Sequence, residues 1–436
     1  MNKKLSVNRR NFVKGSATVA GGVMLGGLPL ESHAHSAAND KIKIALVGCG
    51  GRGTGAAIQA LTVKEDVELV SMADAFKDRL DSSYENIVTE MGDKKRVNVK
   101  NKNKFVGFDA YKGAIDLADV VILTTPPGFR PEHLEYAITA DKHIFCEKPL
   151  ATDPAGIRKV LELAEVAKQK KLNVVVGLQR HYQTVYRELM KRVHGGEIGQ
   201  VTTTQVYWNG GGVWVHPRQE SWTEMEYQMR NWYYFNWLCG DHIVEQHIHN
   251  LDVSNWAAQG HPVVAQGMGG REVRTAKEYG EIFDHHYVEF KYADGTVMNS
   301  QCRHIKGCFN KVAEEIIGTK GRADSTGAIY DLKGNIVWKH RNVDDPNPYQ
   351  VEHDELFASI VEGGYINDLV NGANSTMTAI LGRMATYSGV EIHWEDALNS
   401  DIKLVPDTFS WNANPPVLPD NEGFYPIPVP GVTKVI

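Results

Sequence analysis

The chain has few of the features that would place it in a specialised class. Its 436 residues include only five cysteines and no CxxC pair, so the sequence supports neither a zinc ribbon nor a disulfide framework. It contains no internal repeat, and no apolar run is long and uninterrupted enough to predict stable membrane insertion. A hydrophobic content of 42% with 23% charged residues excludes disordered, collagen-like and coiled-coil chains.

Basic residues are scarce outside the N-terminus. The formal net charge is −6, and the first 34 residues hold five basic residues against one acid, so the rest of the chain carries −10. Binding to nucleic-acid phosphates requires a basic face. We therefore expect no nucleic-acid partner.

Residues 1–34 have the pattern of an export signal. The paired arginines Arg9 and Arg10 precede Phe12, and a weakly apolar, glycine-rich run follows over 15–30. This pattern predicts a twin-arginine signal peptide and a periplasmic location. Because that route carries folded proteins, a bound cofactor would be loaded before export.

From about residue 40 the chain alternates short apolar runs with helical patterns, which is the βαβ rhythm of a parallel sheet. The predicted strands are Ile42–Val47, Val67–Ala73, Asp119–Thr124, His143–Cys146 and Asn173–Gly177. The predicted helices are Gly53–Leu61, Ala75–Met91, Ala110–Leu117, Pro131–Ala140, Asp153–Lys171 and Val185–His194. A lysine-rich stretch, Lys94–Lys104, is predicted as a loop. Together they predict a Rossmann domain over 40–160, with a doubly wound parallel sheet.

Beyond Gly199 the pattern changes to alternating strands. The predicted strands are Val201–Trp208, Ile282–Tyr292, Thr296–Cys302 and Val312–Gly318, and the predicted helices are Asp354–Gly363 and Ser375–Ser388. We expect a second domain over 161–405 with a large, mostly antiparallel open sheet, and a proline-rich extended tail over 406–436. The fold class is therefore α/β.

A glycine-rich turn joins the first predicted strand to the first predicted helix. It contains four glycines, Gly48, Gly50, Gly51 and Gly53. They permit a tight turn and let backbone N–H groups approach a pyrophosphate at the helix N-terminus. The second strand ends at Asp74, where a carboxylate can bind both hydroxyls of an adenosine ribose. Asp74 would repel a 2′-phosphate, so NAD is the predicted cofactor, while Arg52 and Lys77 keep NADP open.

Lys148 follows another predicted strand, in the segment Cys146-Glu147-Lys148-Pro149. Ligands of parallel sheets bind beyond the carboxyl ends of the strands, so Lys148 is predicted to face the cofactor cleft. A surface lysine before a turn is the alternative.

A histidine-rich segment runs from Gly240 to Asp252. If it is helical, Glu245 and His249 are four residues apart and share a face. A carboxylate below an imidazole can orient it, which suits a general base. The alternatives are buried structural histidines or a metal site. Since the HxxEQH spacing matches neither HExxH nor HxxEH and no outlying ligand set is evident, no metal is predicted.

Over nearly all of 41–400 the sequence resembles the Gfo/Idh/MocA oxidoreductase family, whose namesakes include glucose–fructose oxidoreductase and inositol dehydrogenase. Beside the glycine turn, the segments that carry the resemblance are Thr125-Pro126-Pro127, Glu147-Lys148-Pro149, Gly177-Leu178-Gln179-Arg180, Gly318-Thr319-Lys320-Gly321 and Gly382-Arg383-Met384-Ala385. The resemblance implies a Rossmann domain, a second α/β domain whose open sheet faces solvent or another subunit, and hydride transfer between NAD(P) and a hydroxyl of a sugar or cyclitol.

The resemblance also assigns roles. The lysine, aspartate and histidine of the family's cleft would fall on Lys148, Glu245 and His249, with a glutamate one methylene longer in place of the aspartate. Thr125, Pro126 and Glu147 would join the cofactor site, together with Lys148.

Aromatic residues are dense between 207 and 237, interleaved with polar ones. A sugar ring stacks on aromatic faces while polar groups bind its hydroxyls, although such aromatics also pack cores and interfaces. The predicted substrate-binding residues are Arg180, His181, Tyr182, Trp208, Trp214, His216, Arg218, Trp232 and His247.

The leading interpretation is a periplasmic NAD-dependent oxidoreductase that acts on a secondary hydroxyl of a sugar or glycoside. The alternative is an NAD-dependent glycosidase that oxidises C3 transiently, eliminates the glycosidic group and returns the hydride. A non-catalytic sugar-binding protein is the third interpretation. We also expect a homodimer or homotetramer, because the strands near 282–302 would otherwise expose Phe283, Tyr287, Val288 and Phe290.

Overall fold

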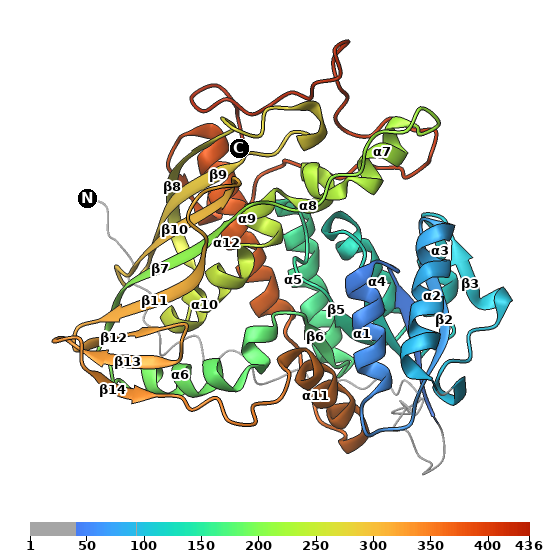
Figure 1. Cartoon of the computed structure of the whole chain (residues 1–436), viewed down its shortest axis with the longest axis horizontal. Helices are drawn as coiled ribbons and strands as arrows, with labels where there is room; N and C mark the ends of the chain where they lie inside the picture. Colours follow the sequence, from blue (N-terminus) through green and yellow to red (C-terminus); the bar gives the residue numbers. More distant parts are fainter. Residues whose placement is uncertain (1–40, 93) are drawn as a thin grey trace, which may run out of the picture. The chain divides into compact units, whose positions relative to one another are not determined.

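The computed structural model describes residues 41–92 and 94–436, and the predicted export signal lies outside these residues. The first sheet has six parallel strands in the order β3-β2-β1-β4-β5-β6 (Figure 1). Its strands are β1 Ile42–Val47, β2 Val67–Asp74, β3 Lys104–Val106, β4 Val120–Leu123, β5 His143–Cys146 and β6 Val174–Val176. The strand order reverses between β1 and β4, so a ligand is expected beyond the carboxyl ends of these strands.

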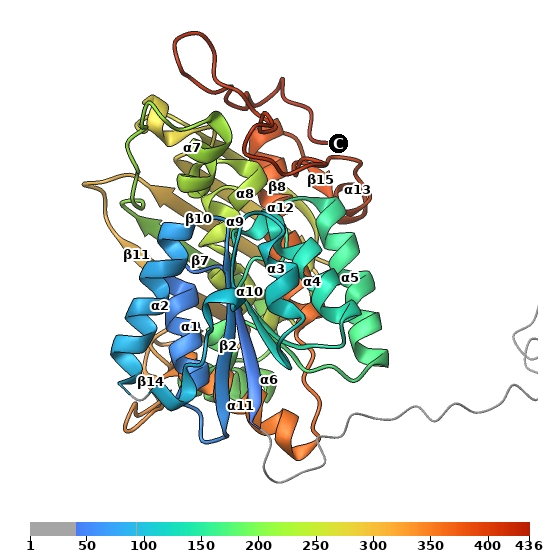
Figure 2. The same cartoon turned by 90° about the vertical axis from the view of Figure 1, so that its right-hand side faces the viewer.

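Helices cover both faces of this sheet (Figure 2). They are α1 Gly51–Leu61, α2 Lys77–Met91 and α11 Pro348–Glu362 on one face, and α3 Ala110–Ile115, α4 Arg130–Thr139 and α5 Pro154–Gln169 on the other. Side chains of β1 alternate between the two layers: Ala45 and Val47 pack in one buried cluster, Ile44 and Leu46 in the other. A strand that is apolar on both faces must be covered on both, and the predicted doubly wound sheet is confirmed.

The second sheet has nine strands in the order β14-β13-β12-β11-β7-β10-β9-β8-β15. They are β7 Val201–Gly210, β8 Pro262–Gly270, β9 His285–Tyr292, β10 Val297–His304, β11 Lys311–Gly318, β12 Gly321–Asp324, β13 Ala328–Asp331, β14 Ile336–Lys339 and β15 Ile392–His393. Of the described neighbours, β7 and β10 pair in parallel and the others are antiparallel. The prediction of a large, mostly antiparallel sheet is confirmed.

Two long helices cover one face of the second sheet. α10 Ile248–Ala258 packs on β7 and β11, and α12 Leu369–Ser388 packs on β8 and β9 and also against α5 (Figure 1). The remaining helices are α6 Thr184–His194, α7 Glu224–Arg230, α8 Asn236–Cys239, α9 His242–Glu245 and α13 Trp394–Leu398. Because α12 contacts both β8 and α5, it connects the second sheet to the helices that cover one face of the first sheet.

This covered face corrects one expectation. Phe283, Val288 and Phe290 are buried within the chain, in the same apolar cluster as the side chains of α12. The alternation of β9 puts only Tyr287 among the four predicted side chains on the open face, where it donates to Asn299. The expected exposure of the other three is wrong, and the homo-oligomer stays a prediction.

Local patterns missed several short elements. β3 begins inside the lysine-rich stretch that was expected to be a loop, and β8 and β12 to β14 had no predicted counterpart. The expected domain boundary at 160 falls inside α5. These strands are short or glycine-rich, so their pairing depends on neighbouring strands more than on their own composition.

The last residues, 406–436, form neither helix nor strand. Trp411 packs against Phe76 and Phe108, and Phe409 packs against Phe108 and Phe129. The tail is therefore held to the first sheet by aromatic contacts. Within 41–92 and 94–436, we find no helix with the length and apolar character needed to cross a membrane.

Candidate functional site

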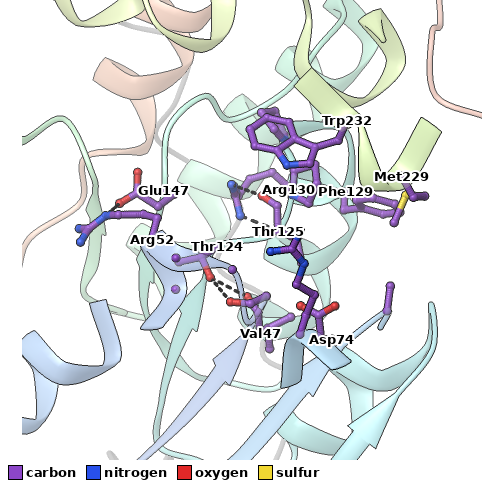
Figure 3. A pocket seen from close by; sticks show the side chains of 18 of the residues that line it. Val47, Arg52, Asp74, Thr124, Thr125, Phe129, Arg130, Glu147, Met229 and Trp232 are labelled. Atoms are coloured by element: carbon purple, nitrogen blue, oxygen red, sulfur yellow. Dashed lines mark hydrogen bonds and ion pairs between the residues drawn. The ribbon is translucent and has the colours of Figure 1, made fainter. Parts of the chain in front are cut away.

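A cavity of about 760 Å³ opens at the carboxyl ends of β1, β2, β4 and β5 (Figure 3). All ten predicted cofactor residues line it: Gly48, Gly50, Gly51, Arg52, Gly53, Asp74, Thr125, Pro126, Glu147 and Lys148. The segments around β7, α7 and α9 contribute Trp208, Trp214, His216, Met229, Trp232, Glu245, Gln246 and His249. The cavity thus lies where the first sheet meets the second part of the chain.

The glycine turn has the backbone geometry of a dinucleotide cradle. Gly48 has φ +98°, and a Cβ there would lie 2.6 Å from the backbone of Thr124. A Cβ on Gly53 would lie 2.0 Å from the carbonyl oxygen of Gly48. Because glycine has no Cβ, the helix can pack close to the end of the strand. Gly50 and Gly51 have open space where a Cβ would be, and α1 begins there without a side-chain cap. The free N–H groups of this first helical turn are suited to a pyrophosphate.

Asp74 ends β2 beside this turn. Its Oδ2 accepts a hydrogen bond from the backbone N–H of Cys49 at 2.6 Å, and its Oδ1 accepts from that of Phe76 at 2.8 Å. Each oxygen keeps a lone pair for a ribose hydroxyl. Burial raises the pKa of Asp74 above its ordinary value, and the two backbone N–H groups oppose this rise. The turn and the carboxylate together fit an adenosine diphosphate group.

Arg52 faces away from Asp74 and toward Glu147 (Figure 3). Its Nε lies 2.5 Å from Oε1 of Glu147, and its Nη2 lies 3.6 Å from Glu352 of α11. The guanidinium also lies over the ring of Tyr349, 4.9 Å from its centroid. The positive charge of Arg52 is therefore already matched by Glu147, whereas burial raises the pKa of Glu352 well above its ordinary value.

Arg130 holds the loop that follows β4. Its guanidinium, almost fully buried, donates to the carbonyl of Leu123 at 2.8 Å. It also donates to the carbonyl of Thr125 at 2.7 Å (Figure 3). Burial lowers the pKa of Arg130. These bonds position Thr125 and Pro126 at the cavity wall, and no local motif near residue 130 indicated this contact.

Lys148 and Glu245 form an ion pair inside the cavity. The Nζ of Lys148 lies 3.0 Å from Oε1 of Glu245, and it also donates to the Glu245 backbone carbonyl. Both side chains are largely buried, with 11% and 13% of their surface exposed. The ammonium group is thus fixed at two points by the end of α9.

His249 lines the same cavity, but not as a continuation of α9. That helix ends at Glu245 and α10 begins at Ile248, so Glu245 and His249 do not belong to one continuous helix. The ring of His249 stacks on Trp208 at 6.0 Å, and its buried Nδ1 has no hydrogen-bond partner among the described residues. The expected orientation of His249 by Glu245 is therefore replaced by the pairing of Glu245 with Lys148.

The surroundings of His249 keep it neutral. Burial lowers its pKa well below the ordinary histidine value, and the positive charges of Lys148, Arg180 and Arg52 lower it further. A neutral imidazole can accept a proton, which is what a general base requires.

Aromatic side chains form the part of the cavity wall contributed by β7 and by the segments that follow β7 and α7. Trp214 lies 5.9 Å from Trp232 and 4.8 Å from the ring of His216. Trp214 is exposed and Trp232 partly exposed, so both offer ring faces rather than filling the core. Four of the nine predicted substrate residues therefore reach the cavity: Trp208, Trp214, His216 and Trp232.

The other five predicted substrate residues do not line the cavity. They are engaged elsewhere: Arg180 with Glu314, His181 with Asp252, Tyr182 with Asp368, Arg218 with Glu224, and His247 with Ser300. Each is a polar side chain that already has a partner, and for all but Arg218 that partner comes from a distant segment. Sequence proximity to a strand end or to His249 could not reveal these partners.

Sequence reasoning also missed several cavity residues. Arg79 of α2 lines the wall near Asp74, and its Nη2 lies 3.5 Å from Nε2 of His216. Tyr349 arrives from α11, some 300 residues along the chain from Arg52, which it contacts. Neither belongs to a motif, so only the tertiary contact identifies them.

Comparison with known proteins agrees with this geometry. Residues 42–178 match a family described as "Oxidoreductase family, NAD-binding Rossmann fold", and residues 186–324 match the "GFO/IDH/MocA C-terminal domain". An inositol 2-dehydrogenase of Gluconacetobacter diazotrophicus is 32% identical over 164 residues, which cover 38% of this chain and 42% of that enzyme. The chain thus aligns with less than half of that relative.

Two solved structures have the same fold. The aldose-aldose oxidoreductase from Caulobacter crescentus, complexed with glycerol, matches with a TM-score of 0.63 at 18% identity, over 81% of this chain and all of that one. The scyllo-inositol dehydrogenase from Lactobacillus casei, with bound NAD(H) and scyllo-inositol, matches with a TM-score of 0.60 at 19% identity, over 82% of this chain and all of that one.

Proposed function

Because the chain belongs to the Gfo/Idh/MocA oxidoreductase family, we propose that it is an NAD-dependent dehydrogenase acting on a hydroxyl of a sugar or sugar alcohol. One observation carries the proposal. A dinucleotide cradle, an ammonium group and a neutral imidazole line one cavity, contributed by Gly48–Gly53, Lys148 and His249. These are the groups that hydride removal from an alcohol requires.

The residues of the cavity have separate roles in this reaction. A bound nicotinamide would accept the hydride from the substrate carbon. His249 takes the proton of the substrate hydroxyl. Lys148 holds the same oxygen and stabilises the negative charge that develops on it, while Glu245 keeps the ammonium in place. The rings of Trp208, Trp214 and Trp232 offer faces on which a sugar ring can stack.

The test of this function begins with the purified protein. Mass spectrometry of the small molecules released by denaturation should detect NAD(H). A screen of inositols, aldoses and alkyl glycosides should then find a compound that reduces the cofactor, followed at the absorbance of NADH. Release of an aglycone without net NADH would favour the redox-assisted glycosidase, and no turnover of any compound would favour a binding protein.

Asp74 supports NAD over NADP as the cofactor. Arg52 is paired with Glu147 and Glu352, and Lys77 is paired with Asp81, so the two cations that kept NADP open already have partners. We expect Asp74→Ala to weaken NAD binding about 10–100-fold, the loss typical of hydrogen bonds to a charged group, and to affect NADP less. Calorimetry with both nucleotides measures this difference. Glu85→Ala, which removes an exposed carboxylate of α2 that does not line the cavity, is the matched control; equal losses of NAD and NADP in Asp74→Ala would contradict the role.

The N-terminal pattern supports export by the twin-arginine route to the periplasm. We expect the replacement of Arg9 and Arg10 by lysine to leave the precursor in the cytoplasm, because this route requires the arginine pair. Fractionation of cells that express each form measures the distribution. Replacement of Lys3 and Lys4 by arginine is the control, and unchanged periplasmic accumulation of the first variant would contradict the prediction.

A further inference from the structure

A second group of ionisable side chains lies outside the cavity, where α9 begins. Asp241 and His242 come from this end of α9, and His286 comes from β9. All three side chains are fully buried. Oδ1 of Asp241 lies 3.3 Å from Nε2 of His286 and 3.8 Å from Nε2 of His242, and one ligand atom from each residue lies within 4.8 Å of the others.

The carboxylate of Asp241 has no lysine or arginine partner among the described ion pairs. Its Oδ2 accepts from the Tyr387 hydroxyl and from the backbone N–H of Phe283, and its Oδ1 accepts from the backbone N–H of His242. A buried carboxylate requires a cation nearby.

The ring of His286 points its acceptor nitrogen at this carboxylate. The hydroxyl of Thr386 lies 3.1 Å from the carbonyl of Gly382, to which it can donate, and its oxygen then accepts from Nδ1 of His286 at 2.9 Å. Nδ1 therefore carries the proton, and Nε2 carries a lone pair. This nitrogen has no hydrogen-bond partner, so two acceptors face each other at 3.3 Å unless a positive ion or a proton lies between them.

His242 is a second histidine of this cluster with unpartnered ring nitrogens. Both of its ring nitrogens lack hydrogen-bond partners although its side chain is fully buried. His304 stacks on its face at 4.2 Å and leaves the nitrogens at the ring edge free.

The backbone at Asp241 is strained in a way that serves this cluster. Asp241 has φ +74° and ψ +161°, a conformation that residues other than glycine rarely adopt. This conformation presents the carboxylate to both histidines. Such strain persists only where surrounding contacts hold it, and it concentrates at functional positions.

We propose that Asp241 Oδ1, His242 Nε2 and His286 Nε2 bind one zinc ion. Two imidazole nitrogens and one carboxylate oxygen are a donor set that zinc accepts, and the separations of 3.3 and 3.8 Å are close to those between ligands of a tetrahedral ion. The Thr386 hydroxyl orients the His286 ring as an outer partner of a metal ligand does.

The ion would stabilise, from outside the cavity, the segment that carries Glu245. It would join the start of α9 to β9, and the Tyr387 hydroxyl would join both to α12. α9 ends at Glu245, the partner of Lys148. The proposed zinc is therefore a structural ion that positions the catalytic ion pair, and it does not contact the substrate.

The full-length protein, purified without chelators, tests this proposal by elemental analysis. We expect about one zinc per chain, and below about a tenth of that in His242→Gln and His286→Gln. His353→Gln is the matched control, because His353 is also fully buried with both ring nitrogens unpartnered but lies on α11. It should keep its zinc. Cobalt added to chelator-treated protein should give the absorption bands of a tetrahedral site, a readout independent of activity.

The wild-type protein alone can overturn the proposal. Absence of zinc after growth in zinc-supplemented medium, together with no binding of zinc by the chelator-treated protein in calorimetry, would do so. The cluster would then be an ion pair of Asp241 with a protonated His286. Equal loss of zinc in His353→Gln and in the two cluster variants would also contradict the assignment.

Discussion

Replacing His249 by alanine is expected to lower kcat about 10²–10⁴-fold while NAD(H) stays bound, because a positioned general base contributes that much to proton transfer. His249 lines the cavity with Lys148, whereas the glycine turn and Asp74 are untouched by the change. Steady-state kinetics on the substrate identified by the screen, with the bound nucleotide quantified after denaturation, measure both effects. A near-normal kcat would mean that another residue of the cavity acts as the general base.

The pH profile gives this prediction a second readout. An ordinary histidine, with a pKa near 6.5, loses its function as a base when it is protonated below that pH. Burial, and then the charges of Lys148, Arg180 and Arg52, lower the pKa of His249. Its neutral form therefore persists to lower pH. The midpoint of the loss of kcat/KM on the acid side should therefore lie below pH 6.5. This loss should vanish in His249→Ala. It should remain in His247→Gln, a buried neighbour that does not line the cavity.

Replacing Lys148 by methionine is expected to lower kcat about 10²–10³-fold, the effect of removing one group that stabilises a developing oxyanion. Glu245→Gln should cost less, since the Lys148 ammonium also donates to the backbone carbonyl of Glu245 and this contact survives the change. Steady-state kinetics of both variants show which of them loses more kcat. Lys159→Met is the matched control, because it removes a lysine from an exposed pair with Glu135.

The double variant distinguishes a positioning role for Glu245 from an independent one. If Glu245 acts through Lys148, Lys148→Met with Glu245→Gln should lose no more activity than Lys148→Met alone, because coupled residues are not additive. The two side chains lie 3.0 Å apart, well within the range of such coupling. Multiplicative losses would instead mean that Glu245 contacts the substrate itself.

The sequence was most informative where structure is local. The strand Ile42–Val47, the glycine turn and Asp74 follow one another within 33 residues, and each is specified by composition alone: an apolar run, glycines without a Cβ, and a carboxylate at a strand end. The structure adds the reason for two of the glycines, since a Cβ at Gly48 or Gly53 would overlap backbone atoms. Five of the six parallel strands were predictable for the same reason, whereas the short strand β3 was not.

Side-chain partners were not predictable, because they come from distant segments. Arg180, His181 and Tyr182 follow a strand end and have polar groups suited to a sugar, yet they bind Glu314, Asp252 and Asp368. The alternation along β9 puts Val288 and Phe290 on the face opposite Glu289 and Lys291, but it does not show whether another element of the same chain covers that face. Val288 and Phe290 therefore read as exposed until α12 is found to cover them.

The sequence by itself determined the class of this protein: an α/β chain with a glycine-rich turn after the first strand, an acid at the end of the second strand and a lysine at another strand end, all fixed by residue type and short spacing. Tertiary structure decided how the histidine-rich segment is used. A single helix would have put Glu245 beneath His249, but the break after Glu245 turns its carboxylate to Lys148, sends His249 to the cavity and leaves His242 buried beside Asp241 and His286. The physical reason is that packing against β7, β9 and α12 sets where each turn of this segment points, and no local pattern carries that information.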